Sequence, residues 1–215
     1  MAFDDGVLFD AAFLGHLRAL IGKHHKLYPA IPPQGIYFES LVERAFLSAG
    51  WPRSHITLEN PNSPKADIRV GKRRLSLKTE TGKVTRETLI SITKLCTTET
   101  GEWVSEALIK HALAHLTRYE GVLMLRAVWT PKRAPKAINY QLVEIPIGLL
   151  EKMSAGEALA VGRRKGRRSL GFDVMDGDDI LFHVHFDGAD GKCQIRKLPV
   201  DRCIMLDRWQ QPLAE

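Results

Sequence analysis

The sequence predicts an α/β fold, in which helices flank a mixed central sheet and a C-terminal antiparallel β meander follows. Three observations lead to this prediction. Residues 36–49 repeat apolar side chains at helical spacing, and residues 122–129 are an almost unbroken apolar run, typical of a strand buried on both faces. From residue 169 onward, three strand-like runs are joined by short turns. Helices placed before and between strands indicate a layered α/β arrangement.

Length and charge narrow the class of protein. The 215 residues are enough for one sizeable domain, and 44% hydrophobic and 26% charged residues are ordinary for a globular chain. The net charge of +6 favours a polyanionic partner such as nucleic acid over an acidic small molecule.

The cysteines and the hydropathy pattern indicate where the protein works. Cys96, Cys193 and Cys203 are widely spaced, which indicates neither a zinc site nor a disulfide framework and favours a reducing cytoplasm. No stretch approaches 18 uninterrupted apolar residues, and the acidic start of the chain lacks the basic region of an export signal. We therefore expect a cytoplasmic protein with no membrane partner.

The N-terminal third predicts two helices. Residues 7–21 fit a largely buried helix, with a polar Lys-His-His-Lys run after it, and residues 29–35 form a proline-rich loop. The next helix, residues 36–49, is the clearest element of the chain and ends at Gly50. Glu39 and Glu43 lie one turn apart beside its apolar stripe.

A β-hairpin is predicted where residues 68–70 and 75–78 flank Gly71 and Lys72. Alternation places Ser76, Lys78 and Glu80 on one face of the second strand. If the strands pair, Asp67 before the first strand and Lys78 on the second come within reach of one point. A carboxylate holds a hard divalent cation, and an ammonium group stabilises developing charge or orients water. The alternative is that these are ordinary solvated side chains.

The middle of the chain predicts further helices and strands. Residues 79–87 are a connection, and residues 88–93 fit either a strand or a helical turn. Residues 104–116 predict a helix in which His111 and His115, at i and i+4, have the spacing of metal ligands, although packing or surface roles are favoured. Two strands, 122–129 and 138–147, enclose the positively charged loop 131–136, and a short helix is expected over 148–153.

The densest charge in the protein is the segment 162–168, which we call the basic run. It holds Arg163, Arg164, Lys165, Arg167 and Arg168. Arginine forks match phosphate oxygens and glycine lets the backbone approach, so these residues predict DNA-phosphate contacts. Two alternatives are that they read guanine edges in a groove, or that they form a solvated loop without a partner.

The meander after the basic run offers a second set of polar side chains. Gln194, Arg196 and Lys197 could be presented to DNA. His183 and His185 share one strand face, where a polar surface is favoured over a metal site. The closing segment, 201–215, is expected to cap the sheet.

The pattern of Asp67 on one strand and Ser76-x-Lys78 on the next resembles the PD-(D/E)XK nuclease superfamily, and within it the type II restriction endonucleases. Ala66 stands where the superfamily usually has Pro, and Ser76 stands where it usually has Asp or Glu. In some restriction enzymes with Ser at this place, an acid from elsewhere supplies the missing carboxylate. Glu80 and Glu87 are the candidates here, and Glu80 is preferred because it shares a strand face with Lys78.

The resemblance also implies a glutamate from the first core helix near the metal, for which Glu39 is chosen over Glu43. It implies a restriction-endonuclease-like core in which Asp67, Glu80 and Glu39 hold Mg²⁺ and Lys78 positions the attacking water. The expected activity is sequence-specific hydrolysis of double-stranded DNA by a homodimer. Residues 1–215 would form one nuclease domain, with 154–215 as a candidate DNA-recognition subdomain.

Two other functions stay open. One is a structure-selective nuclease of DNA repair or recombination with the same chemistry. The other is a DNA-binding protein without catalysis, in which Ser76 marks a decayed site.

Overall fold

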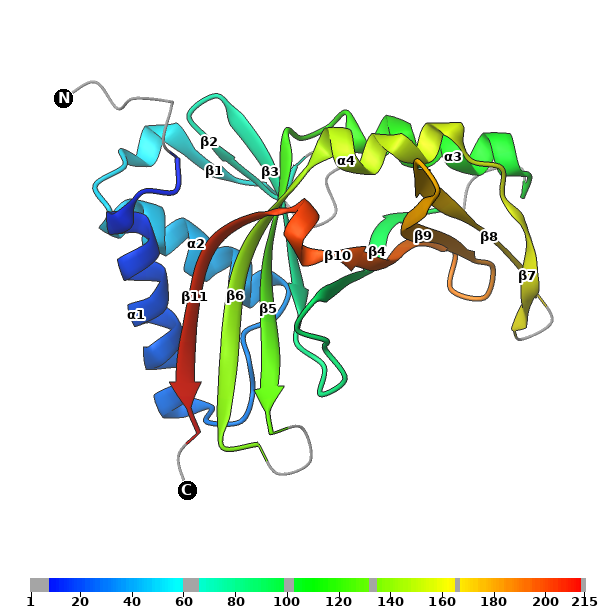
Figure 1. Ribbon diagram of the computed structural model, residues 1–215. Coiled ribbons are helices and arrows are strands. Elements are labelled where there is room, and N and C mark those ends of the chain that lie inside the picture. The colour runs from blue at the N-terminus through cyan, green and yellow to red at the C-terminus, as the bar shows by residue number, and fades with distance from the viewer. Residues whose placement is uncertain (1–7, 60–65, 99–102, 132–134, 165–166, 214–215) are drawn as a thin grey trace. The chain divides into compact units, whose positions relative to one another are not determined.

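The computed structural model describes residues 8–59, 66–98, 103–131, 135–164 and 167–213 (Figure 1). The chain divides into two compact units. The first comprises Met1–Thr85, Tyr119–Glu144 and Met205–Glu215, and the second comprises Arg86–Arg118 and Ile145–Ile204. The chain therefore passes between the units after residues 85, 118, 144 and 204.

The first unit is built on a six-stranded sheet with the order β1-β2-β3-β5-β6-β11. Its strands are β1 (Ile56–Leu58), β2 (Ile68–Val70), β3 (Arg73–Glu80), β5 (Gly121–Thr130), β6 (Ala137–Pro146) and β11 (Ile204–Pro212). β2 is antiparallel to both β1 and β3, whereas β3 and β5 are parallel, so the predicted mixed sheet is confirmed. β5 is buried along its length up to Trp129, as its unbroken apolar run predicts.

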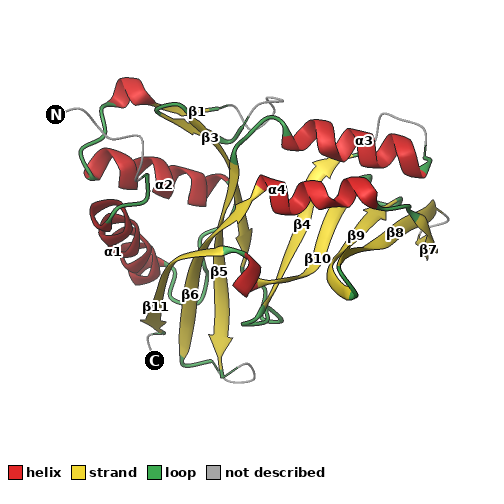
Figure 2. Cartoon of the chain, turned by 45° about the horizontal axis from the view of Figure 1, so that its top comes forward, coloured by secondary structure: helices red, strands yellow, loops and turns green. Residues whose placement is uncertain are grey.

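Two helices, α1 (Ala11–Leu27) and α2 (Ile36–Ser48), lie side by side in both ribbon views (Figures 1 and 2). Their apolar stripes share one core with the sheet, in which Phe13 of α1 stacks on Phe46 of α2 at 4.1 Å between ring centroids. The prediction for α2 is confirmed to within one residue.

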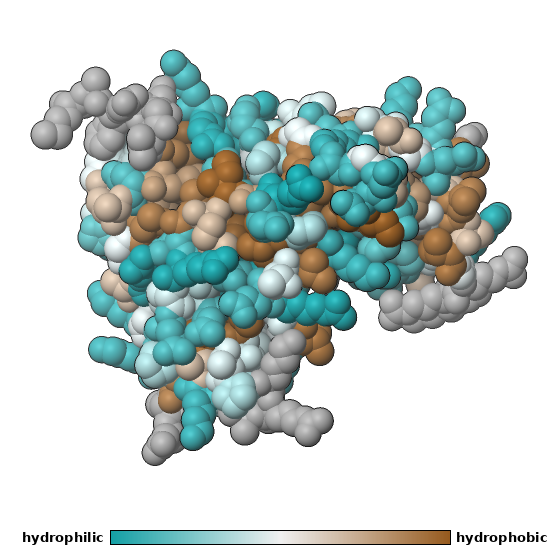
Figure 3. Space-filling model, viewed as in Figure 1, coloured by the Kyte–Doolittle hydropathy of each residue, from teal (hydrophilic) through white to brown (hydrophobic). Residues whose placement is uncertain are grey.

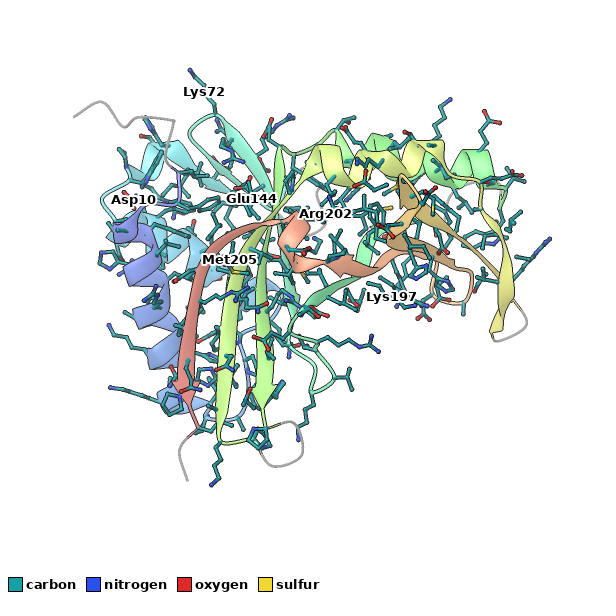
Figure 4. All side chains as sticks on the ribbon, in the orientation of Figure 1. Asp10, Lys72, Glu144, Lys197, Arg202 and Met205 are labelled. Atoms are coloured by element: carbon teal, nitrogen blue, oxygen red, sulfur yellow. The ribbon has the colours of Figure 1, made fainter. Side chains whose placement is uncertain are left out.

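The prediction for α1 was wrong at both ends. The helix begins after Asp10, labelled in Figure 4, whose carboxylate accepts a hydrogen bond from the Phe13 amide at 2.8 Å as an N-cap. It continues through the polar run to Leu27 because His24 and His25 are buried, with the His25 Nε2 atom 2.7 Å from the Tyr140 hydroxyl. Because the burial of His24 and His25 depends on a strand far away in the sequence, local periodicity does not predict it.

The second unit has a five-stranded sheet with the order β4-β10-β9-β8-β7. All neighbouring strands in this sheet are antiparallel. Its strands are β4 (Leu89–Thr97), β7 (Leu159–Arg164), β8 (Arg167–Asp176), β9 (Asp179–Asp187) and β10 (Lys192–Pro199). The predicted meander is confirmed, and the open choice over residues 88–93 resolves to a strand. Two helices, α3 (Ser105–Leu116) and α4 (Ile147–Glu151), lie on one face of this sheet (Figure 2).

The closing segment was expected to cap the sheet; instead it forms β11, an edge strand of the first unit's sheet beside β6. Its Asp207 pairs with Arg18 of α1, and Trp209 stacks on Tyr140 of β6 at 5.1 Å between centroids. Residues 154–215, suggested as a recognition subdomain, consequently fall in both units, with 154–204 in the second and the rest in the first.

The surface is mixed in character. On the face shown in Figure 3, hydrophilic residues predominate, and smaller hydrophobic patches lie between them. No helix in the described part of the chain is long and apolar enough to cross a membrane.

Candidate active site

The hairpin of β2 and β3 brings Asp67 and Lys78 together. Gly71, with φ of 58°, makes the turn, and Ile68 pairs with Leu75. The Asp67 amide donates to the Leu75 carbonyl at 3.0 Å, which extends the pairing one residue beyond β2. The Lys78 Nζ atom lies 3.2 Å from Asp67 Oδ2, so the convergence expected from the sequence is confirmed. Both side chains reach solvent, with 29% of Asp67 and 23% of Lys78 exposed.

Asp67 is held in one orientation by its neighbours on β3. Its Oδ2 atom accepts hydrogen bonds from the Ser76 hydroxyl at 2.9 Å and from the Leu77 amide at 2.6 Å, in addition to Lys78. All the hydrogen bonds that the Asp67 carboxylate accepts from described residues fall on this oxygen, which leaves Oδ1 for a cation. Ser76, in the place of the usual acid, therefore orients the carboxylate.

Glu39 approaches this pair from the first turn of α2. Burial raises the pKa of its half-buried carboxyl, the negative charge of Asp67 raises it further, and the positive charge of Lys78 opposes the shift. These effects place Glu39 within electrostatic range of Asp67 and Lys78. Glu43, one turn further along, instead pairs with Arg53 at 2.6 Å. The choice of Glu39 over Glu43 as a metal ligand stays a prediction.

Glu80 lies in a different environment. Its Oε2 atom is 2.8 Å from Nε of Arg126 on β5, whose side chain is 0% exposed and also donates to Gln141. Its role as a metal ligand stays a prediction, and the carboxylate already neutralises the buried charge of Arg126. Glu87, the other candidate, belongs to the second unit.

Sequence reasoning missed Arg126 because residues 122–129 read as an apolar strand. The signal was available, since a single arginine inside a buried strand needs a carboxylate or amide partner. Glu80, two residues beyond Lys78 on the neighbouring strand, was the nearest candidate for that partner.

The donor set suits Mg²⁺ better than a more demanding metal. Across the described ranges, no three or more His, Cys, Asp or Glu side chains gather where they could hold an ion. Mg²⁺ is commonly bound through one or two carboxylates and keeps several waters. Asp67, with Lys78 beside it and Glu39 within electrostatic range, offers carboxylate chemistry of this kind.

The basic run covers the end of β7 and the start of β8, and residues 165–166 between them lie outside the described residues. Arg163 and Arg164 end β7 and pair in register with Arg168 and Arg167 of β8. Arg168 is exposed, whereas Lys165 and the side chains of the other three arginines lie outside the described residues. The predicted phosphate contacts therefore stay a prediction.

The two histidine pairs show ordinary contacts. His115 Nδ1 lies 3.2 Å from an Arg118 guanidinium nitrogen, and His111 is exposed. On β9, His183 pairs with Asp173 of β8. These contacts agree with the favoured surface and packing roles.

Comparison with known proteins gives three matches. The sequence model of the family described as "SmaI: Type II site-specific deoxyribonuclease" matches residues 10–211. The type II restriction enzyme SmaI of Serratia marcescens is 31% identical over 154 residues, which is 70% of this chain and 61% of that enzyme. The chain therefore spans about three fifths of the length of this curated relative. A solved structure described as a restriction endonuclease in complex with substrate DNA matches with a TM-score of 0.36 and 16% identity, over 66% of this chain and 63% of that one.

Proposed function

The chain belongs to the SmaI family of type II site-specific deoxyribonucleases, and from this premise we propose that it is a type II restriction endonuclease that cuts double-stranded DNA at a specific sequence with Mg²⁺. The observation that carries the proposal is the contact of Asp67 with Lys78, with Glu39 within electrostatic range of both, in a chain that matches the family over residues 10–211. A carboxylate pair beside a lysine is the equipment for metal-assisted hydrolysis of a phosphodiester.

In this proposal Asp67 and Glu39 hold Mg²⁺, which supplies Lewis-acid stabilisation of the charge on the scissile phosphate. Ser76 and the Leu77 amide keep the Asp67 carboxylate in place, so it need not reorganise when DNA binds. Lys78, 3.2 Å from Asp67, orients the attacking water or stabilises the negative charge that develops on the phosphate oxygens.

Two further parts complete the proposal. The basic run supplies phosphate contacts, which fits the net charge of +6. Cutting both strands at a two-fold symmetric site needs two active sites related by the same symmetry, so the working form is a homodimer.

The test is to incubate the purified protein with phage and plasmid DNA and Mg²⁺ and to map the fragment ends. We expect discrete fragments with a common end sequence. Lys78→Ala should lower the rate at least 100-fold, on the order expected for loss of one preorganised charged donor, without weakening DNA binding. The matched control is Lys72→Ala, an exposed lysine at the turn of the same hairpin (Figure 4), which should cut normally.

Other outcomes would replace the proposal. An intact protein that binds DNA but never cuts it with Mg²⁺ would be a binding protein. Cleavage confined to junctions or mismatches would indicate a structure-selective nuclease.

A further inference from the structure

A groove of about 630 Å³ lies on the sheet of the second unit, lined by residues of β7 to β10 and the segment just before β7. Its walls hold polar and charged side chains of both signs, among them Asp173, His183, His185, Arg196 and Lys197. None of these residues contributes to the Asp67 site, and the proposed chemistry makes no use of them.

An irregularity in β10 builds one wall of this groove. The register between β10 and β4 shifts between Ile195 and Leu198, and Lys197 has φ of 57°, which is rare for a residue other than glycine. In a regular strand, consecutive side chains point to opposite faces. Here Arg196 and Lys197, the latter labelled in Figure 4, are both exposed and both line the groove. A strained backbone that turns two neighbouring cations to one side is a feature typical of functional sites.

Arg196 is fixed by its own strand. Its Nε and Nη2 atoms both donate to Oε1 of Gln194, at 3.1 and 2.6 Å, and Gln194 is buried. These bonds use two of the five guanidinium N–H groups and leave the outer Nη1/Nη2 edge as a fork. The positive charge of Arg196 also helps to lower the pKa of His185, after the larger effect of burial, which places the two side chains close together.

A row of three polar side chains, with a carboxylate at one end and a guanidinium at the other, crosses the groove. Asp173 of β8 is in register with His183 of β9, which is in register with Arg196 of β10. The row offers an acceptor at one end and a donor fork at the other. A surface that contacts only phosphates has no use for a carboxylate, whereas base edges present both donors and acceptors.

We propose that this groove reads base edges of double-stranded DNA and that Arg196 is a specificity-determining residue, which donates its outer fork to N7 and O6 of a guanine. The inference deepens the proposed function, because it assigns the sequence recognition of that nuclease to the second unit. Charge complementarity supports the choice of DNA, since β7 and β8, which line the groove, contain the four arginines of the basic run. Arginine donating both bonds to guanine is the commonest specific contact in the major groove.

The experiment separates recognition from cleavage. The Lys78→Ala protein, with its second unit unaltered, is used to select bound duplexes from a random pool without Mg²⁺, and its affinity is then measured for the selected duplex and for an unrelated one. The selected duplex is also made with 7-deazaguanine at each guanine in turn, which removes N7 and keeps base pairing. We expect one such replacement to weaken binding roughly 10- to 100-fold.

The variant Arg196→Ala, added to Lys78→Ala, should bind the selected duplex more weakly by a similar factor and should bind the unrelated duplex with little change. In this variant, the 7-deazaguanine replacement should cause no further loss of affinity for the selected duplex. Arg196→Lys keeps the charge and lacks the fork, so it should behave like Arg196→Ala. The matched control is Arg202→Ala, an exposed arginine of the same unit that pairs with Asp176 outside the groove.

Equal losses for both duplexes would overturn the inference, because they would make Arg196 a phosphate contact. The inference would also be overturned if the losses of binding free energy from Arg196→Ala and from every 7-deazaguanine replacement were additive. The experiment measures binding and not cleavage. An intact protein that shows this guanine dependence and never cuts DNA would therefore contradict the proposed function and still support this inference.

Discussion

Ser76 occupies a site in β3 that has no place for a second carboxylate. The residue is 1% exposed, and its hydroxyl donates a hydrogen bond to Oδ2 of Asp67. A carboxylate at the same position would be desolvated and would face another negative charge. The serine therefore stabilises a single well-oriented acid.

This leads to a prediction about stability. Ser76→Ala should lower the free energy of unfolding by about 1 kcal/mol, the usual value of one hydrogen bond. Ser76→Asp, which restores the acid usual in the superfamily, should cost more than Ser76→Ala. Urea denaturation without Mg²⁺ measures both, and Ser40→Asp, at an exposed serine of α2, is the control, expected within about 0.5 kcal/mol of the parent. A Ser76→Asp protein as stable as the parent would contradict this account.

A second prediction concerns the metal. If Glu39 holds Mg²⁺ with Asp67, Glu39→Gln should raise the Mg²⁺ concentration for half-maximal cleavage by more than about tenfold, since it removes a charged ligand. Glu43→Gln, one turn away and paired with Arg53, should leave that concentration unchanged. The measurement is a Mg²⁺ titration of cleavage rate, and identical curves for the two variants would refute the assignment.

A third prediction separates a structural from a metal-binding role for Glu80. Glu80→Ala would leave the Arg126 guanidinium, which is 0% exposed, without its carboxylate, so we expect a loss of about 3 kcal/mol in the free energy of unfolding. The loss should appear in buffer containing a chelator. A variant with normal stability there and a specific defect in the Mg²⁺ titration would instead support Glu80 as a ligand.

At the scale of elements, α1 is anchored at its C-terminal end by buried polar groups. His25 lies 2.7 Å from the Tyr140 hydroxyl of β6 and 3.0 Å from the Pro29 carbonyl, and Tyr140 in turn stacks on Trp209 of β11. Burial lowers the pKa of His25, more than the nearby carbonyls raise it.

This anchor predicts a pH dependence. The folded pKa of His25 lies below its ordinary value of 6.5, so the unfolded chain binds the proton first as pH falls. The contribution of neutral His25 to the free energy of unfolding is complete above pH 6.5 and is lost as the pH falls from there through the pKa of His25 in the folded protein. Urea denaturation followed by tryptophan fluorescence at several pH values should show this loss, and His25→Gln should reduce it. The prediction fails if both proteins show the same slope.

Individual elements differed in how far sequence could predict them. The α2 helix, the β2–β3 hairpin and α3 follow from local periodicity, and so does the meeting of Asp67 with Lys78. Gln194, Arg196 and Lys197 of β10 were expected to be presented to DNA; Arg196 and Lys197 are exposed, whereas Gln194 is buried. That the two neighbouring cations line one groove could not be predicted, because a bulge breaks the alternation on which strand patterns depend. Burial of His24 and His25 was missed because the polar run gives no local sign of the strand that covers it.

At the scale of the whole molecule, the division into two units was not visible in the sequence. Each unit is assembled from segments that are separate in the chain, which no local sequence pattern marks. The sequence also did not predict which sheet β11 joins, because strands that pair across a long stretch of chain produce no local sequence pattern.

The proposed homodimer gives a prediction at this scale. Mixing the parent protein with excess Lys78→Ala protein, after exchange of subunits, should yield heterodimers with one working site. Such dimers should convert supercoiled plasmid mainly to the nicked form, whereas the parent should linearise it. Gel electrophoresis of the plasmid distinguishes these products, and mixing with Lys72→Ala should give linear DNA. Sedimentation of a strictly monomeric protein that still cuts both strands together would count against the dimer.

The second unit is made of two segments, Arg86–Arg118 and Ile145–Ile204, joined by the pairing of β4 with β10. A single crossover between two related genes would give a chimera in which β4 from one parent must match β10 from the other. Exchanging this unit whole requires four junctions, and both segments must be inherited together. If the unit does read DNA, new specificities in this family would arise more readily from point substitutions along β8 to β10 than from shuffling of gene fragments.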